Sequence, residues 1–513
     1  MHSVLNSKFL VPCSIFKRPY GQEFIMKLLF TLLVLLVPLA IQAQGYITKS
    51  IKDFGAKGNG RTNDQDAFVK ASAFFNKRKG NGKLIIPKGI YRVGRQKFSG
   101  NDKGSIAYVG EYAIDLRACV NMIIEGQAGA ILKNNDSLKI GTFSPVTGKA
   151  FKHAIKDINV KPEYAGYAAN AGNAVFISGC SNIKISGLVI DGNVANFSFG
   201  GNWGIGRNAF ELIHYGIYIV DANDISVNKC SIKNFACDGI YIANLGQQLK
   251  TYNIFIDHCE VNYCGRNGLS WIGGENIRVS NSVFSNSGQG TVHESPAAGI
   301  SIEVENSSFC RKGYFFHCTM ENNIGSAITS GSKDLATNVV FKNCTAASPV
   351  YYSLFADAAS HVFEDCKFYG TVLVWYKGVA EKDAVKFRRC VFEENYRGKK
   401  MYDGTYLFGA EATGVEVDSC TFRAYTTADY YLNALTKDCS TGNTQKIQIS
   451  NSSFYSYSQT GSKLGEKIAG IAGHTVFYNN KFYAPPAVNF LNGFDANCNA
   501  DAGKNSFYPA PGK

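Results

Sequence analysis

A short alternation of apolar and polar residues recurs along most of the chain. From residue 182 onward, each repeat is an alternating strand, a polar bend, a small residue and a second apolar pair, as in NIFIDHCEVNYC and GVEVDSCTFRAY. Alternation with a period of two predicts β-strands that bury one face. The small residue after the bend recurs at Cys230, Cys259, Ser282, Cys318, Cys344, Cys366, Cys390, Cys420, Ser452 and Asn480.

The spacing of these small residues, 22 to 36 positions, predicts the architecture. Units of roughly 20–50 residues built from strands and turns indicate a solenoid or a propeller, and propeller blades need about 40 residues or more. We therefore predict an all-β solenoid, a parallel β-helix over about residues 115–485. Each coil would bury its inward side chains against the next coil.

The N-terminus has the pattern of an export signal. After a lysine at position 27, an apolar stretch runs from Leu28 to Ile41 and a small residue follows at Ala43. This pattern predicts a signal peptide cleaved after Ala43, with Met26 as the true start, and it is too short for a spanning helix. Residues 1–43 are thus an upstream extension and signal peptide, and we expect a secreted or periplasmic protein without a membrane span.

The cysteines of this exported chain do not follow a disulfide pattern. Fifteen cysteines would normally indicate disulfides, but most of those in the repeats share one inward position and would form a ladder of small buried thiols. Cys119 and Cys180 match each other in a second register. Only Cys439 and Cys498, near the C-terminus, form a candidate disulfide. Metal-binding spacing of the CxxC type does not occur.

The charge of the chain favours a polyanionic partner. Removing residues 1–43 leaves 49 basic and 39 acidic residues, a formal charge of +10. An exported protein with this excess is expected to meet a polyanion. Runs of Lys and Arg interleaved with aromatics, typical of nucleic-acid binding, do not occur. We therefore expect an acidic polysaccharide and no nucleic acid.

The segment before the repeats predicts a cap and carries a family resemblance. Thr62 followed by Gln65 is a capping-box pattern and predicts a helix over about 63–76. The phrases DFGAKGNG, ND and IPKGIY around this helix resemble the N-terminal cap of the pectate lyase superfamily, in its rhamnogalacturonase- and epimerase-like form. The resemblance implies a right-handed β-helix with an N-terminal cap over 44–114 and a C-terminal cap over 486–513. Its members include hydrolases, lyases, uronate epimerases and phage tailspikes, so the motif does not identify a reaction.

Two columns of side chains mark a candidate site. The phrases YGIYI, DGIYI, NGLSW, AGISI and SAITS would be parallel strands lying side by side. Their outward residues are Tyr218, Tyr241, Ser270, Ser301 and Thr329, and a second column at the strand entry holds His214, Tyr215, Asp238, Arg266 and Asn267. Tyr faces suit pyranose rings, and Arg suits a carboxylate.

Two long loops flank these columns and extend the candidate site. Residues 191–216 carry Trp203 and Arg207, and residues 285–299 carry His293 and Glu294. Loops that lengthen on one side of a solenoid often build its binding site. The substrate-binding candidates are Arg266, Asn267, Tyr241, Tyr218, Ser301, His214, Trp203 and His293.

The catalytic candidates are Glu303, Glu305 and Asp238. In AGISIEVE the two glutamates would share one strand face about 7 Å apart, within the roughly 5–9.5 Å range of glycoside-cleaving carboxylate pairs. Glu303, nearer Arg266, would be ionised, and Glu305 would be the acid. Each candidate also has a structural interpretation: a solvated strand face for the glutamates, a turn for Asp238, a surface ion pair for Arg266 and a core position for Trp271.

Family templates narrow the reaction only in part. Asp238 in CDG matches the first acid of the polygalacturonase pattern, but RNG and AAG replace the later DD and GHG motifs. The Asp-Pro-His triplet of mannuronan epimerases is missing, and Glu303-Val304-Glu305 loosely resembles the Glu-x-Asp pair of carrageenan-cleaving β-helices. No cluster of acids for calcium stands out, so we expect no metal or cofactor, with calcium only for a lyase.

These observations leave two classes of function open. The first is a secreted enzyme that cleaves a uronate-rich or otherwise anionic glycan, with glycoside hydrolysis slightly favoured over a polysaccharide lyase or uronate epimerase. The second is a non-catalytic glycan-binding surface protein on the same scaffold.

Overall fold

The computed structural model describes thirteen stretches of the chain. It divides into two units, Met1–Gly45 and Tyr46–Lys513. Several residues of the sequence analysis lie outside the described residues: the predicted signal peptide, Trp203, Arg207, Cys439 and Cys498. The described ranges are 45–99, 107–152, 166–201, 212–246, 250–305, 308–376, 383–401, 406–412, 414–425, 429–434, 447–457, 475–484 and 503–509.

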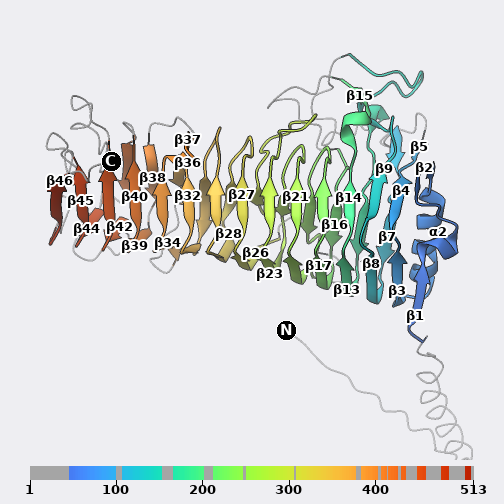
Figure 1. The fold of residues 1–513 in the computed structure, drawn as a ribbon, viewed down its shortest axis with the longest axis horizontal. Helices are drawn as coiled ribbons and strands as arrows, with labels where there is room; N and C mark the ends of the chain where they lie inside the picture. Colours follow the sequence, from blue (N-terminus) through green and yellow to red (C-terminus); the bar gives the residue numbers. More distant parts are fainter. Residues whose placement is uncertain are drawn as a thin grey trace, which may run out of the picture. The chain divides into compact units, whose positions relative to one another are not determined.

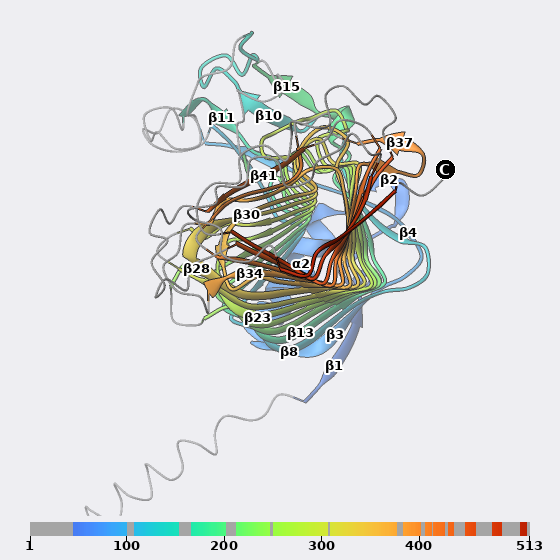
Figure 2. The same ribbon diagram turned by 90° about the vertical axis from the view of Figure 1, so that its left-hand side faces the viewer.

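The second unit is a parallel β-helix, as predicted, whose coils lie side by side from β1 and β3 to β46 (Figure 1). Viewed along the stack, the strands of successive coils superpose on three faces (Figure 2). Face 1 carries the candidate site and consists of β7 (Ile114–Arg117), β12 (Val175–Ser178), β16 (Ile217–Val220), β19 (Ile240–Ala243), β22 (Leu269–Trp271), β25 (Ile300–Ile302), the start of β28 (Ile328–Lys342), β30 (Leu354–Ala359), β33 (Val372–Val374), β38 (Tyr406–Ala412) and β41 (Asp429–Ala434).

Faces 2 and 3 complete each coil. Face 2 holds β1 (Ile47–Ser50), β3 (Gly80–Ile86), β8 (Val120–Gly126), β13 (Ser181–Ser186), β17 (Asn223–Asn228), β20 (Tyr252–Asp257), β23 (Gly274–Ser280), β26 (Cys310–Phe316), the end of β28, β31 (Val362–Glu364), β34 (Val385–Arg388), β39 (Val415–Asp418), β42 (Ile447–Ser450) and β44 (Thr475–Tyr478). Face 3 holds β2 (Asn59–Asn63), β4 (Gly89–Val93), β9 (Ala130–Asn134), β14 (Val189–Asp191), β18 (Ser231–Lys233), β21 (Glu260–Asn262), β24 (Val283–Ser285), β27 (Thr319–Glu321), β29 (Thr345–Ala347), β32 (Lys367–Tyr369), β35 (Val391–Glu393), β40 (Thr421–Ala424), β43 (Ser453–Ser456), β45 (Lys481–Ala484) and β46 (Ser506–Pro509).

The ends and sides of the stack carry the remaining elements. The predicted helix is α2 (Gln65–Lys77), which begins two residues later than expected. The prediction of a capping box is wrong, because Asp64 precedes the helix without a side-chain cap. The Gln65 side chain instead accepts a hydrogen bond from Gly94 N and donates one to Tyr112 O. A side sheet, which the sequence did not predict, consists of β5 (Gln96–Phe98), β6 (Tyr108–Gly110), β10 (Lys139–Thr142), β11 (Ala168–Ala169) and β15 (Ser198–Gly200). The remaining short elements are β36 (Asn395–Tyr396), β37 (Lys399–Lys400), η2 (Ile51–Phe54) and η4 (Val194–Asn196).

One continuous apolar core fills the stack. Equivalent inward side chains of successive coils contact each other, as in the stacked rings of Phe315, Phe341 and Phe363. Trp271 is fully buried in this core, as the alternation predicted. Within the described residues, no helix is both long and apolar enough to cross a bilayer.

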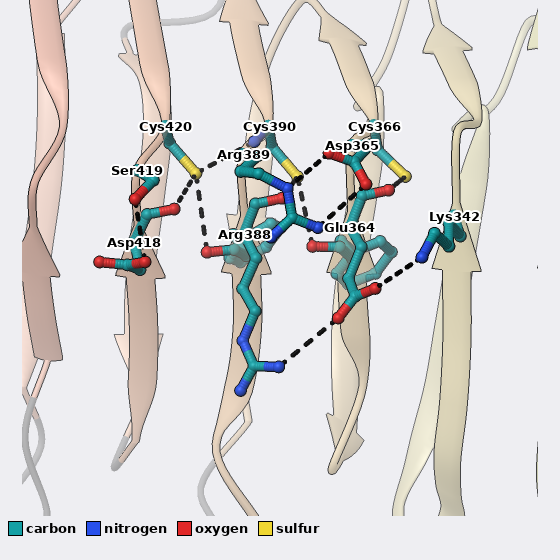
Figure 3. Close-up of polar contacts among 12 residues, drawn as sticks. Lys342, Glu364, Asp365, Cys366, Arg388, Arg389, Cys390, Asp418, Ser419 and Cys420 are labelled. Atoms are coloured by element: carbon teal, nitrogen blue, oxygen red, sulfur yellow. Dashed lines mark hydrogen bonds and ion pairs between the residues drawn. The ribbon is translucent and has the colours of Figure 1, made fainter.

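The cysteine ladder lies at the turn from face 2 to face 3. The residue before each ladder position has a left-handed backbone, for example Asp365 (φ 54°) and Arg389 (φ 53°), which bends the chain. The Cys and Ser side chains of the ladder donate to the carbonyl two residues before them: Cys390 Sγ lies 3.5 Å from Arg388 O and Ser452 Oγ lies 2.7 Å from Ser450 O. Asn480 donates instead to Ile449 O at 2.9 Å. Figure 3 shows three rungs of this ladder beside the ion pairs of face 2.

All twelve cysteines of the described residues are buried free thiols. Cys119 and Cys180 adjoin each other in their own register, with Cys119 N 3.3 Å from Cys180 Sγ. Both cysteine predictions are thus confirmed for this part of the chain. The ladder needs a small side chain that can satisfy a backbone carbonyl, which explains why Ser and Asn share it with Cys.

We predict that Cys390→Ser retains stability and that Cys390→Leu does not. Serine preserves the bond to the carbonyl and changes stability by less than about 1.5 kcal/mol, whereas leucine overpacks the turn and costs about 1–3 kcal/mol. Urea unfolding of both variants measures the difference. Equal stability of the two variants would contradict the prediction, because it would show that the turn accommodates a leucine side chain without overpacking.

Candidate functional site

The outward column on face 1 has the predicted register. Tyr218 pairs with Tyr241, Tyr241 with Ser270, Ser270 with Ser301 and Ser301 with Thr329 in adjacent parallel strands. Ser270 and Ser301 are buried, at 1% and 3% exposure. The accessible parts of the column therefore lie on either side of these serines, which corrects the expectation that Ser301 contacts substrate.

The tyrosines of the column pack on one another. Tyr241 stacks on Tyr215 with ring centroids 4.7 Å apart, and Tyr218 meets Tyr241 edge to face at 5.0 Å. Tyr241 is only 7% exposed, so its face is not free for a sugar ring, while Tyr218 is partly exposed. Burial raises the pKa of Tyr218 to about 12, and burial followed by the charge of Glu305 raises that of Tyr241 further. Both hydroxyls therefore carry their protons at neutral pH.

Asp238 and Arg266 form a buried ion pair beneath these rings. Arg266 Nε lies 3.0 Å from Asp238 Oδ1 and a terminal guanidinium nitrogen lies 2.7 Å from Oδ2, while the Asn267 backbone N–H donates to Oδ1 at 2.9 Å. The Asp238 side chain is not exposed, and that of Arg266 is 9% exposed. Burial opposes the charge of Arg266, but the charge and hydrogen bonds of Asp238 raise its pKa well above the usual value.

This pair corrects three expectations. Asp238 does not reach substrate; it positions Arg266, whose guanidinium lies 5.7 Å from the centre of the Tyr241 ring. Arg266 is committed to a buried carboxylate rather than to a surface one or to a uronate. Asn267 is also buried, because its side chain donates to Ser270 Oγ at 3.0 Å and accepts from Ala298 N at 2.9 Å.

Glu303 and Glu305 are exposed at the end of β25. The strand itself ends at Ile302, so the prediction that it runs to residue 305 is wrong. Val304 between the glutamates nevertheless packs against the core, and both side chains point outward. The Tyr241 hydroxyl lies 3.4 Å from Glu305 Oε2.

His214 is a core residue. It is fully buried between the rings of Phe197 and Phe235, each 4.8 Å away, which corrects the expectation that it binds substrate. Its Nδ1 accepts from Ala236 N at 2.9 Å, and its Nε2 lies 3.1 Å from Asn134 Nδ2. Burial lowers the pKa of His214 to about 3.

A cavity of about 720 Å³ lies on the other side of the serines, and the sequence analysis found only His293 and Thr329 of its lining. Thr329 belongs to the strand paired with β25, so the cavity adjoins the strand that carries the glutamates. The outward column continues from Thr329 to Phe355 and Leu373 in the next two coils. Extending the column by these two positions in the sequence would have indicated the cavity. The lining comprises His293, Ser295, Pro296, Ile324, Gly325, Ser326, Thr329, Val350, Tyr351, Tyr352, Phe355, Leu373 and Trp375.

Among the described residues, no group of three or more His, Cys, Asp or Glu side chains is arranged to hold a metal ion. The calcium that the lyase alternative would require therefore has no ligand set in this part of the chain, and we derive no step through it.

We predict that Asp238→Asn destabilises the fold by about 3–5 kcal/mol, because it leaves the Arg266 charge buried without a partner. Adding Arg266→Met should recover part of the loss, since both charges are then removed. Urea unfolding of the two single variants and the double variant measures the coupling. The control is Asp365→Asn, which breaks an exposed pair of the same two-point geometry with Arg389 and should leave stability nearly unchanged. Equal effects at positions 238 and 365 would contradict the buried pair.

We predict that the fold loses stability as pH falls below about 6.5. His214 and His361 have pKa values lowered by burial to about 3 and about 4, so only the unfolded chain binds their protons in this range. Each should reduce stability by up to about 1.4 kcal/mol per pH unit, down to its folded pKa. His361→Gln should reduce the slope, whereas the exposed His317→Asn should not. Unfolding free energies measured from pH 7 to pH 4.5 test this, and an unchanged slope in His361→Gln would refute it.

Comparisons with known proteins agree with this architecture. Residues 105–309 match the family described as a right handed beta helix region, and no curated protein sequence matches the chain. Similar solved structures include a mannuronan C-5 epimerase A-module from Azotobacter vinelandii, with 13% identity over 90% of this chain and 100% of that chain and a TM-score of 0.48. A family 28 exopolygalacturonase from Yersinia enterocolitica has 11% identity over 92% of this chain and 79% of that chain, with a TM-score of 0.43. A surface adhesin of Streptococcus pneumoniae has 13% identity over 91% of this chain and 92% of that chain, with a TM-score of 0.43. Similarity at this level assigns no activity. The chain has a right-handed parallel β-helix fold.

Proposed function

We propose that this protein is an exported polysaccharide-cleaving enzyme, a glycoside hydrolase that acts on a uronate-containing or otherwise anionic glycan. The observation that carries the proposal is the position of Glu303 and Glu305. They project from the end of β25, and the neighbouring strand β28 contributes Thr329 to the aromatic cavity. The export predicted from the sequence, and the formal charge of +10 without residues 1–43, support the class of substrate.

The sequence suggested that Glu303 is ionised and that Glu305 is the acid, and we propose the reverse assignment from the contacts of Glu305. Tyr241 keeps its proton and donates towards Glu305 at 3.4 Å, and a donated hydrogen bond favours an ionised carboxylate. Arg266, which was expected to act on Glu303, is paired with Asp238 instead. Glu305 is therefore the base or nucleophile and Glu303 the acid that protonates the leaving oxygen.

The buried ion pair also favours hydrolysis over elimination. Elimination needs a group that neutralises the uronate carboxylate while a base removes the adjacent proton. Arg266, which was expected to bind a substrate carboxylate, is paired with Asp238 below the surface.

A second candidate function is glycan binding without cleavage. The observation that favours it is the composition of the cavity, in which none of the described lining residues is a carboxylate. A binding protein needs only such a surface, and its exposed glutamates would be solvated side chains.

We predict that the double variant Glu303→Gln/Glu305→Gln loses cleavage by about 10²–10⁴-fold and still binds glycan, because it removes acid–base chemistry without changing side-chain shape. The assay follows new reducing ends and ultraviolet-absorbing unsaturated ends on pectin, alginate, sulfated glycans and mammalian glycans. The control is Glu260→Gln on face 3, an exposed glutamate that should leave cleavage unchanged.

Three outcomes decide between the candidates. New reducing ends that depend on both glutamates support hydrolysis. An unsaturated product that persists in Glu305→Gln would overturn hydrolysis in favour of elimination. Binding without any product would leave the glycan-binding protein as the function.

A further inference from the structure

The cavity on face 1 is built by four successive coils. Its lining comes from the loop before β25, the turn into β28, the loop before β30 and the end of β33. Coils about 4.8 Å apart make this a span of about 14 Å along the stack. A volume of about 720 Å³ is within the usual range of ligand pockets, about 300–1,000 Å³. The cavity therefore has the dimensions of a site for one or more sugar rings.

The cavity offers aromatic surface. Tyr351 and Trp375 are 50% and 37% exposed. Tyr351 meets Tyr352 edge to face at 4.6 Å, and Tyr352 lies 5.9 Å from Phe355. Exposed aromatic side chains gathered at one hollow indicate a binding surface rather than scattered surface residues. Such rings suit the apolar face of a pyranose or a methyl group.

Among the described residues that line the cavity there is no Lys, Arg, Asp or Glu. Its one imidazole, His293, has a pKa lowered by burial and adds no charge at neutral pH. A uronate buried here would lose hydration without gaining a cationic partner, which is costly. On face 2, Lys342 and Arg388 both pair with Glu364 (Figure 3).

We infer that this cavity is a subsite for an uncharged sugar that carries a methyl or acetyl group, such as a 6-deoxyhexose or an N-acetylhexosamine. The inference rests on the proposed function and specifies it: the glycan would place a neutral residue in the cavity beside the bond near Glu303 and Glu305. The anionic residues of the polymer would then lie outside the cavity. The cavity would select the uncharged sugar because its described lining is uncharged and its surface is aromatic.

Equilibrium binding to the full mature chain tests the subsite. The probes are the methyl glycosides of L-rhamnose, N-acetyl-D-glucosamine and D-galacturonate, followed by saturation-transfer NMR and tryptophan fluorescence. We expect either or both uncharged probes to bind at least about tenfold more tightly than the galacturonate, and Trp375→Ala to weaken them by about tenfold or more. The control is Phe255→Ala on face 2, an aromatic side chain with the same 37% exposure, which should leave binding unchanged.

Each outcome bears on the inference by itself. Equal or tighter binding of the galacturonate, no binding of either uncharged probe, or binding that survives Trp375→Ala would overturn the subsite. Circular dichroism of Trp375→Ala confirms that it folds, and Tyr352→Ala provides a second variant at the same surface. Binding of the uncharged probes that persists in Glu303→Gln/Glu305→Gln, with no cleavage of any glycan by the wild type, would remove the proposed hydrolysis and retain the subsite.

Discussion

Parallel stacking of successive coils is the constraint on which the rest of this structure depends. Each strand hydrogen-bonds to its equivalent in the coil before and the coil after, so inward positions of neighbouring coils lie in contact about 4.8 Å apart. A residue type that suits one coil therefore suits the next. This repetition produces the stacked phenylalanines of the core and the ladder of small side chains at the turn between faces 2 and 3.

The same stacking fixes what face 1 can present to a ligand. Outward residues form a column in strict register, but the register does not make every member accessible. Ser270 and Ser301 are buried, and Tyr241 is covered by Tyr215, so the exposed groups concentrate at Glu303 and Glu305 on one side and at the aromatic cavity on the other. Function is thus expected where loops and strand ends interrupt the regular surface.

Charge is distributed unevenly with respect to this face. Asp238 and Arg266 neutralise each other below the surface, and the described residues of the cavity lining carry no Lys, Arg, Asp or Glu. The positive charge of the chain as a whole is therefore not concentrated at the candidate site. The glycan that we propose, with both anionic and neutral residues, is consistent with this distribution, because overall charge would favour the encounter and the cavity would accept a neutral ring.

The sequence by itself determined the coil, the three-part repeat, the buried cysteine ladder and the column from Tyr218 to Thr329, because a period-two pattern and parallel stacking leave little freedom in which side chains become neighbours. The candidate site was less predictable. His214, Asp238 and Asn267 follow polar patterns that an accessible site would also show, yet turn geometry places them below the surface. Only the tertiary structure decided that Asp238 and Arg266 pair, that Tyr241 donates towards Glu305 and that four coils enclose an uncharged cavity. These outcomes depend on where loops of unequal length cross the stack, and a repeat pattern carries no information about that.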